Sequence, residues 1–145
     1  MSETLGNSLR GELSPELTPE LAELVTASRA VRERAYAPYS RFLVGAAVRA
    51  ENGEIFVGCN VENASYGATI CAERSAILSM IAAGQRSITG IAVFTDADTL
   101  AMPCGLCRQV ISEFHQNARL VVANPRQLRV LGFSEIFPEP FLLDR

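Results

Sequence analysis

Three cysteines and one glutamate form the part of this sequence best suited to chemistry. Cys104 and Cys107 are three residues apart, so on a helix they share one face and can hold one metal ion. Cys71 begins another predicted helix, and thiols at helix N-termini have lowered pKa values because free backbone N–H groups favour anions. Zinc prefers such thiolates, and three protein ligands leave the fourth tetrahedral position open for water. The spacing therefore predicts an open zinc site held by these three cysteines.

Two other residues were candidates for a fourth ligand, and neither fits well. Cys59 falls in an apolar segment predicted to be a strand, where a lone cysteine usually packs as a small hydrophobic residue. His115 follows Cys107 by eight residues, which is about 12 Å further along the predicted helix. A closed structural site is therefore less favoured than an open one.

Glu73 is placed to act on a water molecule at the open position. It lies two residues after Cys71, so it cannot easily bind the same ion, but its carboxylate can reach the water. A glutamate in the first turn of a helix is also common for electrostatic reasons alone. Because Cys–x–Glu and Pro–Cys–x–x–Cys independently imply the same chemistry, we interpret Glu73 as the catalytic acid and base of a hydrolytic zinc centre.

The hydrophobic pattern predicts the elements that must position these residues. Thr18 is a good N-cap for a first helix, which Pro38 should end. Asn52-Gly53 between two apolar runs predicts a β-hairpin. The order of elements favours a mixed sheet with helices packed on its faces. The remaining elements are predicted as strands at 42–48, 55–59, 88–95 and 120–123, a polar loop at 60–69, and helices at 71–83 and from 104 to about 116–117.

Composition and charge narrow the possible functions. The chain has 145 residues, 48% of them hydrophobic and 20% charged, which fits one domain over residues 18–145 behind a loose polar lead-in at 1–17. All 13 basic residues are arginines and the net charge is −3, so nothing indicates a nucleic-acid partner. The sequence shows neither a signal peptide nor an apolar stretch long enough to cross a membrane. We therefore expect a cytoplasmic protein with reduced cysteines and no membrane partner.

The zinc motif is accompanied by further matches to one family. Segments 35–47 (AYAPYSRFLVGAA), 58–67 (GCNVENASYG), 71–74 (CAER) and 103–109 (PCGLCRQ) together resemble the small-subunit cytidine deaminases that bind zinc through three cysteines. The resemblance covers about residues 21–141. It implies a three-layer α/β/α fold with a mixed sheet of about five strands. It also implies hydrolysis of cytidine and 2′-deoxycytidine to uridine and 2′-deoxyuridine, with release of ammonia, in pyrimidine salvage.

The resemblance also assigns roles in substrate binding. Asn60 and Glu62 would hydrogen-bond the ribose 3′-hydroxyl, and Phe42 would pack against the pyrimidine. The backbone around Ala72 would contact the edge of the base, and Tyr66 belongs to the same ribose-binding loop. Without the resemblance, Asn60 and Glu62 would be interpreted as ordinary turn residues.

Arg74 has a role that follows from charge. Zn²⁺ with three thiolates carries a net charge of −1, which weakens it as a Lewis acid. An arginine that donates to a ligand sulfur reduces this charge and keeps the bound water acidic. The alternative is a solvated arginine on a helix surface.

The family resemblance further implies a homotetramer with one Zn²⁺ per subunit and sites shared across interfaces. In the family, a phenylalanine near the C-terminus reaches a neighbouring site. Phe141 keeps that spacing after Pro138, although residues 142–145 (LLDR) replace the usual glycine–proline ending. The alternative is that Phe141 simply packs on the core of its own chain.

Three other functions remain open at this level. The first is deamination of another small base, such as an aminonucleoside antibiotic, which the Asn60–Glu62 pair disfavours. The second is a nucleic-acid deaminase, which the acidic net charge disfavours. The third is a non-enzymatic module with structural zinc or a redox Cys–x–x–Cys pair, which Cys71 and Glu73 disfavour.

Overall fold

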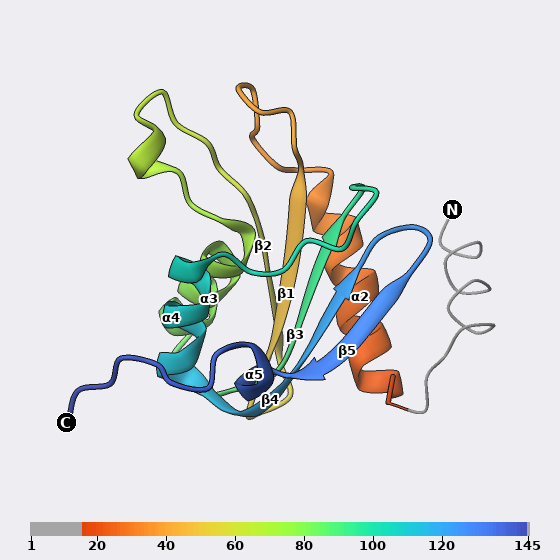
Figure 1. Ribbon diagram of the computed structural model, residues 1–145. Helices are drawn as coiled ribbons and strands as arrows, with labels where there is room; N and C mark the ends of the chain where they lie inside the picture. Colours follow the sequence, from red (N-terminus) through yellow and green to blue (C-terminus); the bar gives the residue numbers. More distant parts are fainter. Residues whose placement is uncertain (1–15, 145) are drawn as a thin grey trace.

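A five-stranded mixed sheet forms the centre of the structure, a computed structural model that describes residues 16–144 (Figure 1). The strand order is β2-β1-β3-β4-β5. Strands β3 and β4 are parallel, and every other neighbouring pair is antiparallel. The strands are β1 (Val44–Ala50), β2 (Ile55–Cys59), β3 (Ile88–Thr95), β4 (His115–Ala123) and β5 (Leu128–Gly132).

Helices cover both faces of this sheet, which gives the predicted three layers (Figure 1). Helix α2 (Pro19–Arg32) packs on one face. The other face carries α3 (Ala72–Ala82), α4 (Gly105–Phe114) and the short α5 (Phe133–Ile136). A 3₁₀ turn, η1 (Tyr66–Ala68), lies in the loop between β2 and α3.

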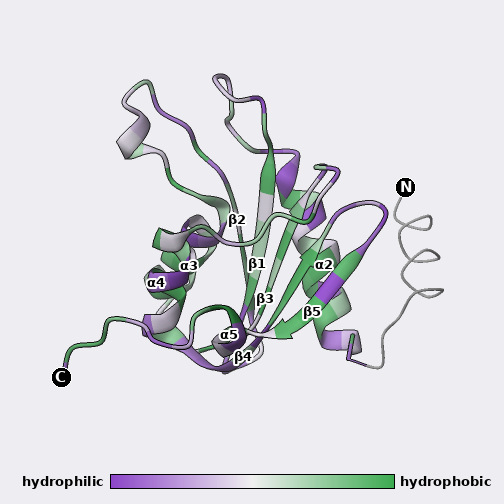
Figure 2. Cartoon of the chain, viewed as in Figure 1, coloured by the Kyte–Doolittle hydropathy of each residue, from purple (hydrophilic) through white to green (hydrophobic). Residues whose placement is uncertain are grey.

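Alternating side chains of the strands build two separate cores. In β3, Ile91 and Val93 face α3 and α4, whereas Ala92 and Phe94 face α2. Both sets are buried, so the central strands are hydrophobic on both faces (Figure 2). Helices therefore pack against the central strands from both sides. The loops at the ends of the strands can form a site.

The first helix is shorter than predicted. It begins after Thr18, whose hydroxyl accepts a hydrogen bond from the backbone N–H of Leu21 at 3.2 Å, as the N-cap prediction required. It ends at Arg32, however, and not at Pro38. The backbone of Tyr36 instead forms a bridge to Val61, so the chain leaves the helix to pair with the loop after β2. This pairing brings the loop before β1 next to the loop after β2.

Other boundaries also differ from those predicted. The first strand begins at Val44 rather than at residue 42, and α4 ends at Phe114 rather than at 116–117. Strand β4 begins at His115 rather than at 120, with an irregular register near Asn117, whose φ is +47°. Pairing with β3 therefore extends the strand beyond its apolar segment. Strand β5 and helix α5 were not placed by the sequence analysis.

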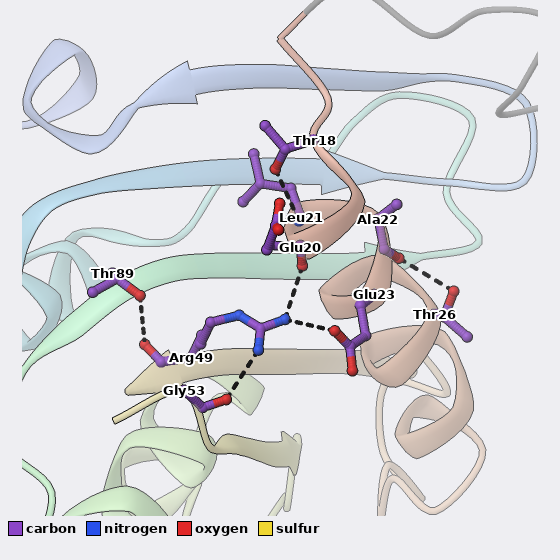
Figure 3. A network of polar contacts seen from close by, with 9 residues as sticks. All are labelled: Thr18, Glu20, Leu21, Ala22, Glu23, Thr26, Arg49, Gly53 and Thr89. Carbon is purple, nitrogen blue, oxygen red and sulfur yellow. Dashed lines mark hydrogen bonds and ion pairs between the residues drawn. The ribbon is translucent and has the colours of Figure 1, made fainter. Parts of the chain in front are cut away.

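Arg49 of β1 joins α2 to the sheet on the face away from the cysteines (Figure 3). Its Nη2 donates to the backbone oxygen of Glu20 at 3.1 Å and to the carboxylate of Glu23 at 2.8 Å. Its Nη1 donates to the backbone oxygen of Gly53 at 2.9 Å. This network joins β1, the turn of the β1–β2 hairpin and helix α2.

The start of the chain lies mostly beyond the described part. Of the predicted lead-in at 1–17, residues 1–15 lie outside the described residues, while Leu17 is buried in the core under α2. Among residues 16–144, no helix has both the length and the apolar character needed to cross a membrane.

Candidate metal centre and active site

Three cysteine sulfurs meet at the N-termini of α3 and α4. Cys71 and Cys104 are the N-caps of these helices, and Cys107 lies one turn into α4. All three Sγ atoms lie within 4.8 Å of one another, and those of Cys71 and Cys104 are 3.8 Å apart. Two thiolates bound to one tetrahedral zinc at about 2.3 Å are themselves separated by about 3.8 Å. The cluster therefore fits the predicted zinc ion.

Neither of the two rejected ligands belongs to the cluster. Cys59 lies in β2, as predicted, and is half-buried. His115 is not on the helix where the sequence analysis placed it, because α4 stops one residue earlier and β4 begins there. Its ring packs edge-on against the ring of Phe133, with 4.9 Å between the two ring centroids. Among the described residues, the group suited to a metal ion therefore consists of the three cysteines.

The three thiols and Arg74 lie close enough to change one another's pKa values. A hydrogen bond from Cys107 and contacts with Arg74 lower the pKa of the Cys71 thiol to about 5. The same interaction, together with burial, raises the pKa of the Cys107 thiol in the metal-free chain. Arg74 Nη2 donates to Cys71 Sγ at 3.4 Å and to the Thr69 carbonyl at 3.2 Å. Arg74 thus lies against a ligand sulfur, where it can offset thiolate charge.

Glu73 is enclosed beside the same sulfurs. It lies in the first turn of α3 and is buried, with 5% of the residue exposed. Burial raises the pKa of its carboxyl group, and the negative charge of Cys71 adds to this effect. A carboxyl group with a raised pKa next to a metal centre is suited to take up and return a proton.

A cavity of about 260 Å³ opens onto this centre. This volume is slightly below the range of about 300–1,000 Å³ that is usual for small-molecule sites. The residues that line it come from three loops, the start of α3, and the strands β1 and β3. Among them are Phe42, Asn60, Glu62, Cys71, Ala72, Glu73 and Cys104.

The structure thus brings most of the predicted site residues together, but two lie elsewhere. Tyr66 is 76% exposed and lines a neighbouring hollow together with Tyr39. The two rings meet edge-on, with 5.9 Å between their centroids. Phe141 is 68% exposed on the C-terminal tail and does not line the cavity of its own chain. It is therefore not docked on its own core, which was the alternative expectation. The Gln109 side chain on α4 forms hydrogen bonds of 2.8 and 3.3 Å with the backbone of Phe141.

Asn60 connects the walls of the cavity. Its Oδ1 accepts from the backbone N–H of Val44, and its Nδ2 donates to the backbone oxygen of Phe42, both at 2.8 Å. One N–H and one lone pair of the amide remain for a ligand. Asn60 therefore also holds the segment that carries Phe42.

Glu62 is held by residues that the sequence analysis did not single out. Its Oε1 accepts from the backbone N–H groups of Tyr39 at 2.9 Å and Ser40 at 3.1 Å, and its Oε2 accepts from the Ser40 hydroxyl. The Ser40 hydroxyl is the main cause of the lowered pKa of Glu62. The contact joins residues 22 positions apart, so no local spacing indicated it. The pairing of Tyr36 with Val61 sets the two loops in register for it.

Comparisons with known proteins agree with this site. Residues 19–124 match the family model described as the cytidine and deoxycytidylate deaminase zinc-binding region. The chain is 48% identical over 95 residues to a cytidine deaminase of Sporosarcina psychrophila, an alignment that covers 66% of this chain and 70% of that protein. It is 42% identical over 110 residues to a cytidine deaminase of Mycobacterium tuberculosis, with 76% and 80% covered. The crystal structure of a cytidine deaminase from Burkholderia pseudomallei superposes with a TM-score of 0.79 at 44% identity, covering 83% of this chain and 98% of that one.

Proposed function

Since the chain belongs to the cytidine and deoxycytidylate deaminase family, we infer that it hydrolyses cytidine to uridine and ammonia. The observation that carries this inference is the cluster of Cys71, Cys104 and Cys107 beside the buried Glu73 at one cavity. Neither a redox pair nor a closed structural zinc site needs a buried carboxyl group or a cavity at that place.

The cysteines, Glu73 and Arg74 would have different roles in the reaction. The cysteines would hold Zn²⁺, which when bound supplies an acidified water for attack on C4 of the pyrimidine. Glu73 would take a first proton from that water and deliver it to N3 of the ring, and would then move the second proton, from the hydroxyl added to C4, to the departing amine. Arg74 donates to Cys71 Sγ and so offsets the negative charge of the three thiolates.

The remaining lining residues suit a nucleoside. Phe42 lies on the cavity wall, where it would pack against the base, and the backbone of Ala72 would contact the edge of the base. Asn60 and Glu62 would bind a ribose hydroxyl through the groups that their own contacts leave free. Both cytidine and 2′-deoxycytidine fit this assignment if the 3′-hydroxyl is the group bound.

Deoxycytidylate is a second candidate because the family model includes its deaminases. Among the described residues, no arginine lines the cavity, and the chain has no lysine. The lowered pKa of Glu62 keeps a negative charge on the cavity wall, which repels a phosphate. These observations favour the free nucleoside.

We also propose a cytoplasmic homotetramer that functions in pyrimidine salvage, as one domain from residue 18. Exposed apolar side chains support association, since Leu78 of α3, Leu106 of α4 and Phe141 all face solvent in the isolated chain. Phe141 and Tyr66 would then contribute to the site of a neighbouring subunit. The four free cysteines, three of them in the cluster, are compatible with a reducing compartment.

Ultraviolet absorbance of cytidine with the purified, zinc-loaded protein tests the proposed function, with ammonia measured in the same sample. We expect turnover of cytidine and 2′-deoxycytidine, and turnover of deoxycytidylate and of a single-stranded oligonucleotide at least about 10²-fold lower in kcat/KM. Turnover of deoxycytidylate equal to that of cytidine would reject the nucleoside assignment. Absence of any turnover of cytidine would reject the function itself.

A further inference from the structure

Ser40 lies in one of two loops that line the cavity and is hydrogen-bonded to Glu62 of the other. Its Oγ accepts a hydrogen bond from the backbone N–H of Phe42 at 3.0 Å. Because that lone pair points to Phe42, the Ser40 proton is free to point toward Glu62 Oε2, to which the hydroxyl is hydrogen-bonded. The direction of the Ser40 hydroxyl is therefore set by the backbone and not by solvent.

The contacts around Glu62 leave its carboxylate with few free lone pairs for hydrogen bonds. The backbone N–H groups of Tyr39 and Ser40 both donate to Oε1, and the Ser40 hydroxyl donates to Oε2. An ionised carboxylate offers about four lone-pair directions, so three donors leave about one, on Oε2. A carboxylate held in this way can accept one further hydrogen bond from one hydroxyl group.

The loop that contains Ser40 forms a hydrogen-bonded turn. Arg41 follows it with φ +59°, a left-handed conformation that is uncommon for residues other than glycine. The backbone N–H of Arg41 donates to the Ala37 oxygen at 2.9 Å, which closes the turn. Ser40 itself is exposed at the cavity rim, so its hydroxyl is not needed to fill a core.

We propose that Ser40 is a positioning residue that fixes the Glu62 carboxylate, so that its remaining lone pair accepts a hydrogen bond from a sugar hydroxyl of the nucleoside. This role rests on the proposed function, because it requires that a nucleoside occupies the cavity. Ser40 acts on the nucleoside through Glu62, and the bond from the Phe42 backbone serves to orient its hydroxyl.

A double-mutant cycle with Ser40→Ala and Glu62→Ala tests this role on the zinc-loaded protein. We expect Ser40→Ala to lower kcat/KM for cytidine by about tenfold, mainly through KM, with kcat within about twofold of wild type. In the Glu62→Ala background the same change should cost less than about twofold, because the group that Ser40 holds is gone. Ser40→Thr keeps the hydroxyl and should recover most of the loss. Ser79→Ala removes an exposed hydroxyl on α3 that bonds only the Ser75 carbonyl, and serves as the matched control.

The outcomes separate this inference from the proposed function. Wild-type turnover combined with equal losses from Ser40→Ala in both backgrounds overturns the positioning role alone. The same holds if Ser40→Ala behaves like the wild type, or if its effect falls on kcat with KM unchanged. Failure of the wild type to deaminate cytidine overturns the proposed function and this inference with it.

Discussion

Gly58→Ala tests how the packing of β2 against α3 positions the metal centre. Gly58 lies where the strand approaches the first turns of the helix, and a Cβ atom there would be 2.2 Å from Ala76 N and 2.6 Å from Ala72 O. These two backbone atoms belong to the same helical turn, directly next to Glu73. No side chain can rotate away to make room, so the helix itself must move.

The size of the movement follows from these distances. Non-bonded heavy atoms prefer separations of about 3.5 Å, so α3 must shift from β2 by about 1 Å. Cys71 and Glu73 move with α3, whereas Cys104 and Cys107 stay on α4. A misplacement of about 1 Å can cost about 10²-fold in rate, and overpacking usually destabilises by about 1–3 kcal/mol. We therefore expect kcat/KM for cytidine to fall by about 10²-fold and the melting temperature to fall by about 3–10 °C.

The assay measures kcat/KM, zinc content and thermal unfolding of Gly58→Ala and a control. Gly132→Ala is the control because its Cβ would meet no atom closer than 3.9 Å, at a position before α5. The control should keep both activity and melting temperature. If Gly58→Ala retains activity within about threefold of wild type and melts at the same temperature, the inferred dependence of the site on this contact is wrong.

Three further predictions concern charge, assembly and pH. Arg74→Ala should lower activity by about 10–100-fold with zinc retained, and Cys104→His in the same chain should restore part of it by removing one negative charge. Phe141→Ala should raise KM, and mixing it with Glu73→Gln subunits should restore activity per intact zinc site, because the Phe141→Ala subunit can borrow the missing ring. The free energy of unfolding should decrease as the pH falls below the ordinary His115 pKa of 6.5, since burial lowers the pKa of His115 in the folded chain and the unfolded chain then binds more protons. His115→Phe should flatten this slope in chemical denaturation.

Each of these has a result that counts against it. A double variant of Arg74 and Cys104 no more active than Arg74→Ala would reject the charge balance. Mixed tetramers that form, but whose activity per intact site stays at the level of Phe141→Ala alone, would reject a shared site. An unchanged slope of stability between about pH 5 and 7 in His115→Phe would assign the pH dependence to other groups.

The metal centre could be predicted from the sequence because local spacing determines it. Cys104 and Cys107 meet through the geometry of one helical turn, and Cys71 and Glu73 through the first turn of another. The sequence could not show that the two helix ends lie together, and there the family resemblance supplied the missing information.

The elements that were missed depend on contacts between distant segments. Strand β5 (Leu128–Gly132) is short, and its backbone pairing with β4 gives it an extended form. Its alternation of apolar residues with Arg129 after the turn at residues 124–127 was a usable signal. The early end of α2 has no local signal, because the pairing of Tyr36 with Val61 causes it. Ser40 was missed for the same reason, since its partner Glu62 lies in the other loop.

In the proposed function, Glu73 moves protons at a zinc centre that it does not help to build. The most direct test of this role measures zinc content and cytidine turnover on one sample of Glu73→Gln. The amide keeps the shape of the side chain and removes no metal ligand, so we predict about one zinc per chain, as in the wild type, and turnover lower by at least about 10²-fold. Near-normal turnover in the zinc-replete variant would show that Glu73 does not move these protons.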